Sequence, residues 1–276
     1  MKAIACLLVA ALAAGALHAQ EPAPVNVDAL HRPFDEILDI YVRDGLVYYF
    51  ALKRERGKFD RYVQSLAGTS AETVAGWAPD RQLAFWINAY NAFVLRTVID
   101  HYPIRGKSPD YPSSSIRQIP GAFERRTFRA GGRTLTLDAL EKDVIAGFGD
   151  PRALFALGRG AQGGGRLKSE AFTSARIDSQ LQTMASELVQ RRELVFVDAA
   201  NGRLSVSPIF SWREPVFVKI ADRAPAAYAS RSPLERAILA LIDPLLMPNE
   251  TEFLKKNTFS TVFHDFDWSL NDLTGR

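Results

Sequence analysis

The chain has 276 residues, of which 47% are hydrophobic and 24% are charged, and its formal net charge is +3. These are the values of a globular protein, with room for one large domain or two small ones. So small an excess of positive charge does not suggest a nucleic-acid-binding protein, because such proteins usually carry a clustered basic face. With one cysteine in the whole sequence, an internal disulfide framework and a multi-cysteine metal site are both excluded.

The first segment has the pattern of a secretory signal peptide. Lys2 precedes an apolar run that ends in Leu17-His18-Ala19, which predicts cleavage after Ala19. A transmembrane anchor is the alternative, but the run is shorter than the roughly 20 apolar residues that span a bilayer. We therefore expect residues 1–19 to be a signal peptide and the protein to be secreted or periplasmic. Because Cys6 lies inside this segment, the mature chain is expected to lack cysteine and, with it, a thiolate nucleophile.

Helical spacing of apolar residues dominates the next part of the chain. An extended lead-in is expected over residues 20–32, followed by helices over 33–45, 53–68 and 78–103. Gly45 is expected to end the first of these helices. The third is the strongest, and its continuous apolar face consists of Leu83, Ile87, Tyr90, Val94 and Val98.

Hairpins and helices share the second half. Hairpins are expected over 123–137, turning at Gly131-Gly132, and over 194–207, with Asn201-Gly202 as a two-residue turn. A buried strand is expected over 152–157. Further helices are expected over 136–149, with Thr136 or Asp138 near the N-cap, over 173–192 and over 232–246. This order of elements predicts a single α+β domain over residues 33–276, helix-rich with short antiparallel hairpins.

The segment FALGRGAQGGGRLKSEAF, residues 155–172, is rich in glycine and arginine. Gly158 and Gly163 have the spacing of a phosphate-binding loop, but Gly164-Gly165 stand where that motif needs Lys-Ser, so nucleotide binding is not indicated. Consecutive glycine N–H groups, with the charges of Arg152, Arg159, Arg166 and Lys168, are consistent with an anion site. The other interpretation is a flexible surface loop whose arginines are solvated.

Other candidate residues are few. His31, His101 and His264 are far apart and form no H-x-x-x-H pair, so neither a metal site nor a cofactor is predicted. No G-x-S-x-G motif marks a nucleophilic serine. Asn88 and Asn91 lie three residues apart inside an apolar helix, where they either contact a ligand or brace neighbouring backbone.

The sequence AFWINAYNAFVL resembles the signature of the domain of unknown function 547 family. Further blocks resemble that family in the same order: YVRDGLVYYFAL, LTLDALEKDVI, FGDPRALFAL, LSVSPIFSW and FHDFDWSLND. The matching positions are Trp86, Asn88, Asn91, Glu141, Ser207, Trp212, Asp267, Trp268 and Asn271. His31 stands where many members carry a histidine.

The departures from the family pattern concern its reactive groups. The resemblance implies histidine where Leu154 and Lys142 stand, Cys-Ala-Ser where Arg159-Gly160-Ala161 stand, and Cys-Pro where Gly164-Gly165 stand. We infer that cysteine, histidine and glutamate form a thiolate site in relatives. Arginine stays protonated and glycine has no side chain, so neither replaces a thiolate.

These observations predict a non-catalytic protein that binds a small anionic or glycan-like ligand, or a partner protein, through the glycine loop. The expected ligand-binding residues are Asn88, Asn91, Arg159, Gly163, Gly164, Gly165 and Arg166. The alternative is a cell-envelope hydrolase or transferase that uses Glu141 with Ser207 or His31. A structural envelope protein, with no pocket near the loop, is a third possibility. Nucleic acid is not expected as a partner, nor is a membrane span after removal of the signal peptide.

Overall fold

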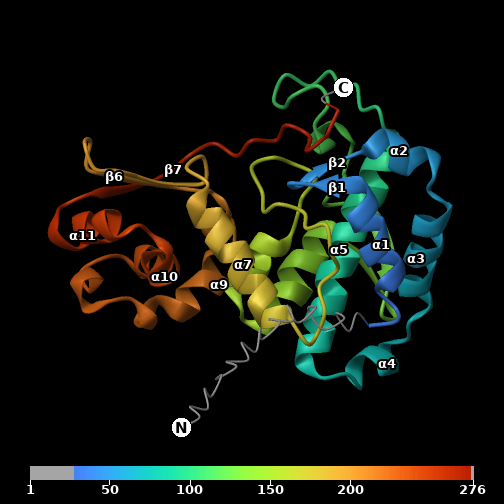
Figure 1. The fold of residues 1–276 in the computed structure, drawn as a ribbon, viewed down its shortest axis with the longest axis horizontal. Coiled ribbons are helices and arrows are strands. Elements are labelled where there is room, and N and C mark those ends of the chain that lie inside the picture. Colours follow the sequence, from blue (N-terminus) through green and yellow to red (C-terminus); the bar gives the residue numbers. More distant parts are fainter. Residues whose placement is uncertain (1–27, 275–276) are drawn as a thin grey trace, which may run out of the picture.

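The computed structural model describes residues 28–274 and confirms a helix-rich α+β fold with short sheets (Figure 1). The predicted signal peptide and most of the predicted lead-in lie outside the described residues. The α-helices are α1 (Arg32–Tyr41), α2 (Tyr49–Arg54), α3 (Gly57–Gly68), α4 (Ala71–Ala75), α5 (Pro79–His101), α6 (Leu137–Ala139), α7 (Ile177–Gln190), α8 (Ile209–Trp212), α9 (Glu214–Phe217), α10 (Pro233–Ile242) and α11 (Pro248–Lys256).

Short 3-10 turns and strands complete the chain. The turns are η1 (Ile116–Gln118), η3 (Ile145–Phe148), η4 (Pro151–Ala156), η5 (Val218–Arg223), η6 (Ala226–Tyr228) and η7 (Asp243–Leu245), and η2 (Leu140–Val144) is a π-helical turn. The strands are β1 (Val42–Arg43), β2 (Leu46–Val47), β3 (Thr127–Ala130), β4 (Arg133–Thr136), β5 (Val195–Asp198), β6 (Arg203–Val206) and β7 (Ser260–Phe263).

Helix α5 is the centre of the fold. In Figure 1 the helices α1 to α4 lie on one side of it, and α7, α9, α10 and α11 with the β5-β6-β7 sheet lie on the other. The predicted apolar face is buried, and so are side chains on the remaining faces, including Phe85, Trp86 and Phe93. A helix that is apolar all round belongs in a core. Pro79 begins it, and it ends at His101, just before the predicted stop at Pro103.

The predicted helix and hairpin positions are largely confirmed, with differences at their ends. Helix α1 ends at Tyr41, and Asp44-Gly45 forms the two-residue turn between β1 and β2, so Gly45 is not a helix stop. Both turn residues have positive φ, as Asp-Gly hairpin turns require. The β5/β6 hairpin closes with a four-residue turn, because Asp198 pairs with Arg203, and not with the two-residue turn predicted.

One local prediction is wrong, and another is confirmed with a change of helix type along its length. Residues 152–157 are not a strand: Pro151–Ala156 form the 3-10 helix η4, because Pro151 presets the backbone and the Asp150 carboxylate accepts a hydrogen bond from the Arg152 N–H. The helix predicted over 136–149 is divided into α6, η2 and η3. Thr136 is its N-cap, as predicted, since its hydroxyl accepts a hydrogen bond from the Ala139 N–H.

The C-terminal segment connects the two sides of the fold. Strand β7 adds to β6 in parallel, whereas only antiparallel pairs were predicted. The chain then returns across the molecule to β2 (red in Figure 1). There the Asn271 carbonyl accepts a hydrogen bond from the Val47 N–H, and the Leu273 N–H donates to the Val47 carbonyl. On its way this segment lies against the glycine loop.

Candidate functional site

A buried ion pair occupies the position at which the family resemblance places cysteine. Arg159 follows η4, and its Nη2 lies 2.7 Å from Oε1 of Glu141 in η2. The exposed fractions of the two residues are 2% and 4%. Arg159 Nη1 also donates to the carbonyl oxygens of Leu154 and Leu157, at 3.1 and 3.2 Å. The guanidinium group is therefore engaged with protein atoms on both terminal nitrogens.

Two further side chains complete the environment of Glu141. Arg213 Nε lies 3.2 Å from Glu141 Oε1, and the Tyr90 hydroxyl donates to Oε2 at 3.3 Å. Burial by itself lowers the pKa of Arg159, but the charge and hydrogen bond of Glu141, together with Tyr90, outweigh it and the pKa lies above the usual arginine value. The pKa of Tyr90 is also raised, first by burial and then by the charge of Glu141. Both groups thus keep their protons, and Glu141 is held by donors on each oxygen.

Arg159 has an unusual backbone conformation. Apart from glycines, only Asp44 and Arg159 have positive φ among residues 28–274, and Arg159 has φ of 43°. Gly160 follows with φ of 64°. A long side chain in this left-handed region is strained, and such strain concentrates at functional positions. The turn directs the Arg159 side chain inward, toward Glu141, and the ion pair holds it there.

The glycines of the loop allow close backbone packing. A Cβ on Gly165 would lie 1.5 Å from the Phe155 carbonyl oxygen, and one on Gly163 would lie 2.6 Å from the Asp267 nitrogen. The loop also pairs with the C-terminal segment, since the Gly163 N–H donates to the Asp267 carbonyl at 2.8 Å. Gly158, Arg159, Gly160 and residues 163–165 are buried. The loop is therefore a packed element, and the interpretation of it as a flexible surface loop with solvated arginines is wrong for Arg159.

Asn88 and Asn91 brace the backbone on either side of the loop. The Asn88 side-chain amide donates to the Phe172 carbonyl at 2.8 Å and accepts from its N–H at 2.9 Å. The Asn91 amide donates to the Ala156 carbonyl and accepts from the Gly158 N–H, both at 2.9 Å. With exposed fractions of 0% and 2%, both side chains act as the backbone braces that the sequence allowed.

The three candidate catalytic residues do not come together. His31 is buried and shares a hydrogen bond of 2.9 Å with the Tyr62 hydroxyl, and burial lowers its pKa to about 4. Ser207 is fully buried, and its hydroxyl accepts a hydrogen bond from the Ile209 N–H. No hydrogen bond joins Glu141, Ser207 and His31 to one another within residues 28–274. At the remaining departures from the family pattern, Leu154 is buried in the core and Lys142 is exposed.

A pocket of about 240 Å³ opens beside the outer part of the loop. It is lined on one side by Gln162, Gly164, Gly165 and Arg166, and on the other by the β1/β2 turn, Arg191, Glu193 and Asn271. Arg166 is exposed and forms no hydrogen bond or ion pair with any described residue. The structure therefore separates the two loop arginines, with Arg159 buried and Arg166 available at the surface.

Sequence reasoning missed several residues of this region. Arg191 donates to the carbonyls of Gly164 and Gln162, at 2.9 and 2.8 Å, and to Glu193 at 2.8 Å. The pKa of Glu193 is lowered, first by this hydrogen bond and more weakly by the charge of Arg166. Asp44, in the β1/β2 turn, also lines the pocket. An Asp-Gly pair before an apolar run is a hairpin signal. The helical pattern of the preceding residues concealed this signal in the sequence.

An aromatic cluster covers the outer side of the C-terminal segment. The rings of Trp212, Phe266 and Trp268 lie 4.4 to 6.0 Å apart between centroids. Arg117 stacks over Trp268 at 4.5 Å, a cation–π contact. Phe266 Cζ lies 3.7 Å from the position of a Cβ on Gly164. The cluster thus packs close to the loop at Gly164, through residues of the last two family-like blocks.

The described part of the chain contains no candidate for a metal site or a membrane-spanning helix. Residues 28–274 contain no group of three or more histidine, cysteine, aspartate and glutamate side chains arranged to hold a metal ion. No helix over the same residues has the length and hydropathy needed to cross a membrane.

Residues 74–189 match the model of the family described as "Protein of unknown function, DUF547". The matched region contains α5, Glu141 and the whole glycine loop, whereas His31, Ser207 and the aromatic cluster lie outside it. No curated protein and no solved structure matches the chain.

Proposed function

Because residues 74–189 match the DUF547 family model, we propose that the protein is a non-catalytic member of that family which binds a small, hydroxylated anion of the sugar-acid type beside its glycine loop. The observation that carries the non-catalytic part is the Arg159–Glu141 ion pair. It fills the position of the family cysteine with a protonated guanidinium group. Arginine is neither a nucleophile nor a base.

The surroundings of the ion pair also oppose catalysis. A general base must lie within hydrogen-bond reach of the group it deprotonates. Glu141 instead accepts from Arg159 and Tyr90 and lies beside Arg213. His31 and Ser207 are each engaged elsewhere in the core. Among the described residues, the hydrolase or transferase interpretation therefore lacks the pairing of Glu141 with Ser207 or His31 on which it depends.

The pocket beside the loop supports the sugar-acid ligand through its charges. Arg166 is a free guanidinium group, and arginine grips a carboxylate with two parallel hydrogen bonds. Asp44 and Glu193 line the same pocket, and ionised carboxylates accept hydrogen bonds from hydroxyl groups. The volume of about 240 Å³ lies below the range usual for drug-sized ligands, which favours a single sugar unit.

Backbone packing places Arg166 in this pocket. Gly45 has φ of 83°, and a Cβ there would lie 2.8 Å from Arg166 Cγ. The arginine stem therefore crosses directly over the β1/β2 turn, beside Asp44. Arg191 holds the glycine loop at the rim by its bonds to the Gln162 and Gly164 carbonyls. A preformed rim reduces the entropy lost on binding.

Titration calorimetry with glucuronate, glucose and acetate tests the proposed ligand class. Glucuronate should bind more tightly than either of the others, and Arg166→Gln should weaken its binding about tenfold or more, the equivalent of about 1.4 kcal/mol. Arg129→Gln is the matched control, because Arg129 is an exposed arginine of β3 without a hydrogen bond or ion pair among the described residues. Equal binding by the wild type and Arg166→Gln, or no binding of any sugar acid tried, would reject the proposal.

A hydrolase substrate panel tests the non-catalytic part separately. We expect no turnover by the wild-type protein. Turnover that disappears in Glu141→Gln, while circular dichroism shows the variant to be folded, would show that the site is catalytic.

Export remains part of the proposal. The apolar leader with its small-residue end at Ala19 supports a secreted or periplasmic location. N-terminal sequencing of the mature protein should begin at Gln20 if the cleavage site is correct. An intact leader on protein recovered from cytosol would contradict it.

A further inference from the structure

A second pocket, remote from the glycine loop, combines an apolar lining with a free arginine. Its volume is about 490 Å³, within the range of small-molecule sites. It lies between residues 148–152 and α7 on one side, and η5 and the end of α10 on the other. It shares no lining residue with the pocket beside the glycine loop.

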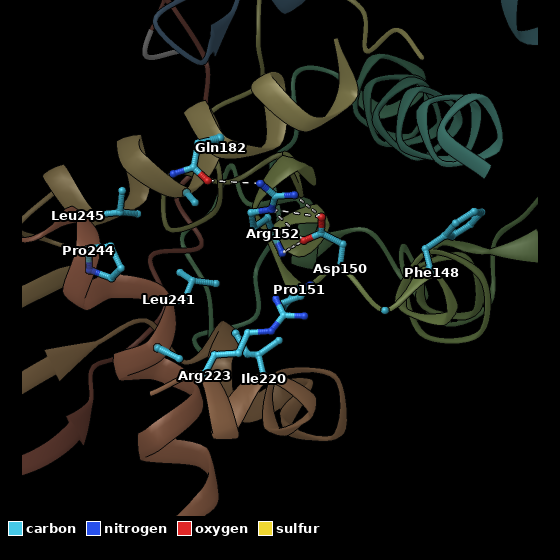
Figure 2. A pocket seen from close by; sticks show the side chains of 13 residues that line it. Phe148, Asp150, Pro151, Arg152, Gln182, Ile220, Arg223, Leu241, Pro244 and Leu245 are labelled. Atoms are coloured by element: carbon cyan, nitrogen blue, oxygen red, sulfur yellow. Dashed lines mark hydrogen bonds and ion pairs between the residues drawn. The ribbon is translucent and has the colours of Figure 1, made fainter. Parts of the chain in front are cut away.

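Most of the residues that line the pocket are apolar. The apolar lining residues with the largest side chains are Phe148, Pro151, Ile220, Leu241, Pro244 and Leu245. Figure 2 shows Leu241, Pro244 and Leu245 on one wall, facing Gln182, Arg152 and Asp150. An open pocket of this kind exposes apolar surface to water, and a ligand tail that covers it gains the hydrophobic free energy of that surface.

The charged groups of the pocket leave one cation without a partner. Arg152 is bound to Asp150 by a 2.7 Å ion pair and also pairs with Asp178. Arg223, at the end of η5, forms no hydrogen bond or ion pair with any described residue. In Figure 2 its guanidinium group points inward, below Pro151. The neighbouring Asp222 forms no ion pair with Arg223, and its carboxylate lies 3.8 Å from Arg236.

The polar groups therefore favour an anion with one charged end. Asp150, Arg152 and Arg223 are the charged lining residues, and their sum is one positive charge. Arg152 is shared between Asp150 and Asp178, so Arg223 is the lining cation that has no carboxylate partner among the described residues. Gln182 adds an amide group to the lining. Its Oε1 accepts a hydrogen bond from Arg152 Nη1 at 3.3 Å, whereas its side-chain NH₂ has no partner among the described residues.

We propose that this pocket binds a free carboxylic acid with an apolar chain, its carboxylate held by Arg223 and its chain covered by the wall formed by Leu241, Pro244 and Leu245. A guanidinium group holds a carboxylate with two parallel bonds. The apolar wall adds affinity for each methylene group that it removes from water. The site is independent of the proposed sugar-acid site, because neither Arg166 nor the glycine loop contributes to it.

Calorimetry with linear carboxylates from butanoate to decanoate, below their micelle concentrations, tests both halves of this proposal. Affinity should rise about fourfold for each added methylene, the equivalent of about 0.8 kcal/mol, until the chain fills the pocket. Decanol, which has the same chain and no charge, should bind about tenfold more weakly than decanoate.

Three variants separate this pocket from other sites. Arg223→Gln should weaken decanoate binding about tenfold; Arg223 is exposed and unpaired, so the fold should not change. Ala240→Phe should fill the pocket and abolish binding. Arg166→Gln should have no effect, which distinguishes this site from the one beside the glycine loop. Equal decanoate affinity in the wild type and Arg223→Gln, binding of decanol as tight as that of decanoate, or no binding of any carboxylate would each overturn the proposal.

Discussion

Arg159→Met tests whether the buried ion pair holds the glycine loop in place. Methionine keeps much of the length and volume of the arginine side chain but none of its charge. The change removes the 2.7 Å bond to Glu141 and the two bonds to the carbonyls of Leu154 and Leu157. It leaves the Glu141 carboxylate in a site where that residue is 4% exposed.

The structure sets the expected magnitude. Removing one partner of a buried ion pair usually costs about 3–5 kcal/mol, because the other charge stays buried. Arg213 Nε at 3.2 Å and the Tyr90 hydroxyl at 3.3 Å remain beside Glu141 and compensate part of its charge. We therefore expect the lower end, about 3 kcal/mol of unfolding free energy. In a protein of this size that corresponds to a fall in Tm of about 6–12 °C.

Urea unfolding followed by tryptophan fluorescence and circular dichroism measures this loss. Arg166→Met is the matched control, an exposed arginine of the same loop, and should change the unfolding free energy by about 0.5 kcal/mol at most. A double-mutant cycle with Glu141→Gln should give a coupling energy of about 1–3 kcal/mol, because the two side chains are in contact.

Two results would refute this reasoning. The first is a loss of less than about 1 kcal/mol for Arg159→Met at an unchanged urea dependence. The second is additivity of Arg159→Met and Glu141→Gln in the cycle. Either would mean that the ion pair does not stabilise the fold or hold the glycine loop in place.

Two further predictions concern residues that the sequence singled out. Burial lowers the pKa of folded His31 to about 4, so below about pH 6.5 the unfolded chain binds more protons than the folded one. The unfolding free energy should therefore fall by about 2–3 kcal/mol between pH 7 and pH 4.5. In urea titrations at these pH values, His31→Gln should remove that part of the pH dependence. Gly165→Ala places a Cβ 1.5 Å from the Phe155 carbonyl oxygen, and should cost more than about 3 kcal/mol or prevent folding. Gly147→Ala is the control and should be tolerated, because no atom lies within 4 Å of the new Cβ. Equal stability of the two alanine variants would contradict the argument that the Phe155 carbonyl leaves no room for a side chain at residue 165.

Local sequence patterns determined most of the elements. The 3.6-residue spacing of apolar side chains in α5, together with Pro79 and Pro103, was enough to place the central helix within about two residues. Gly131-Gly132 likewise fixed the β3/β4 hairpin, because both residues need positive φ and glycine adopts it freely. Such features depend only on neighbours along the chain.

Where two local patterns were compatible with the same residues, only the structure decided. The apolar run of 152–157 is short enough for either a strand or a helical turn, and the Asp150 and Pro151 signals made it η4. The π-helical turn at Glu141 also lacks a sequence signal. That turn places the carboxylate toward Arg159, so the local irregularity determines the candidate site.

By itself, the sequence determined the helical framework, the family resemblance and the absence of sulfur and imidazole from the loop, because these follow from residue identity and spacing. Only the tertiary structure decided that Arg159 is buried against Glu141 while Arg166 faces solvent. Both arginines have the same chemistry and lie seven residues apart in one loop. The difference arises from long-range packing, in which α5, η2 and the C-terminal segment enclose one side of the loop, and no local pattern encodes which side that is.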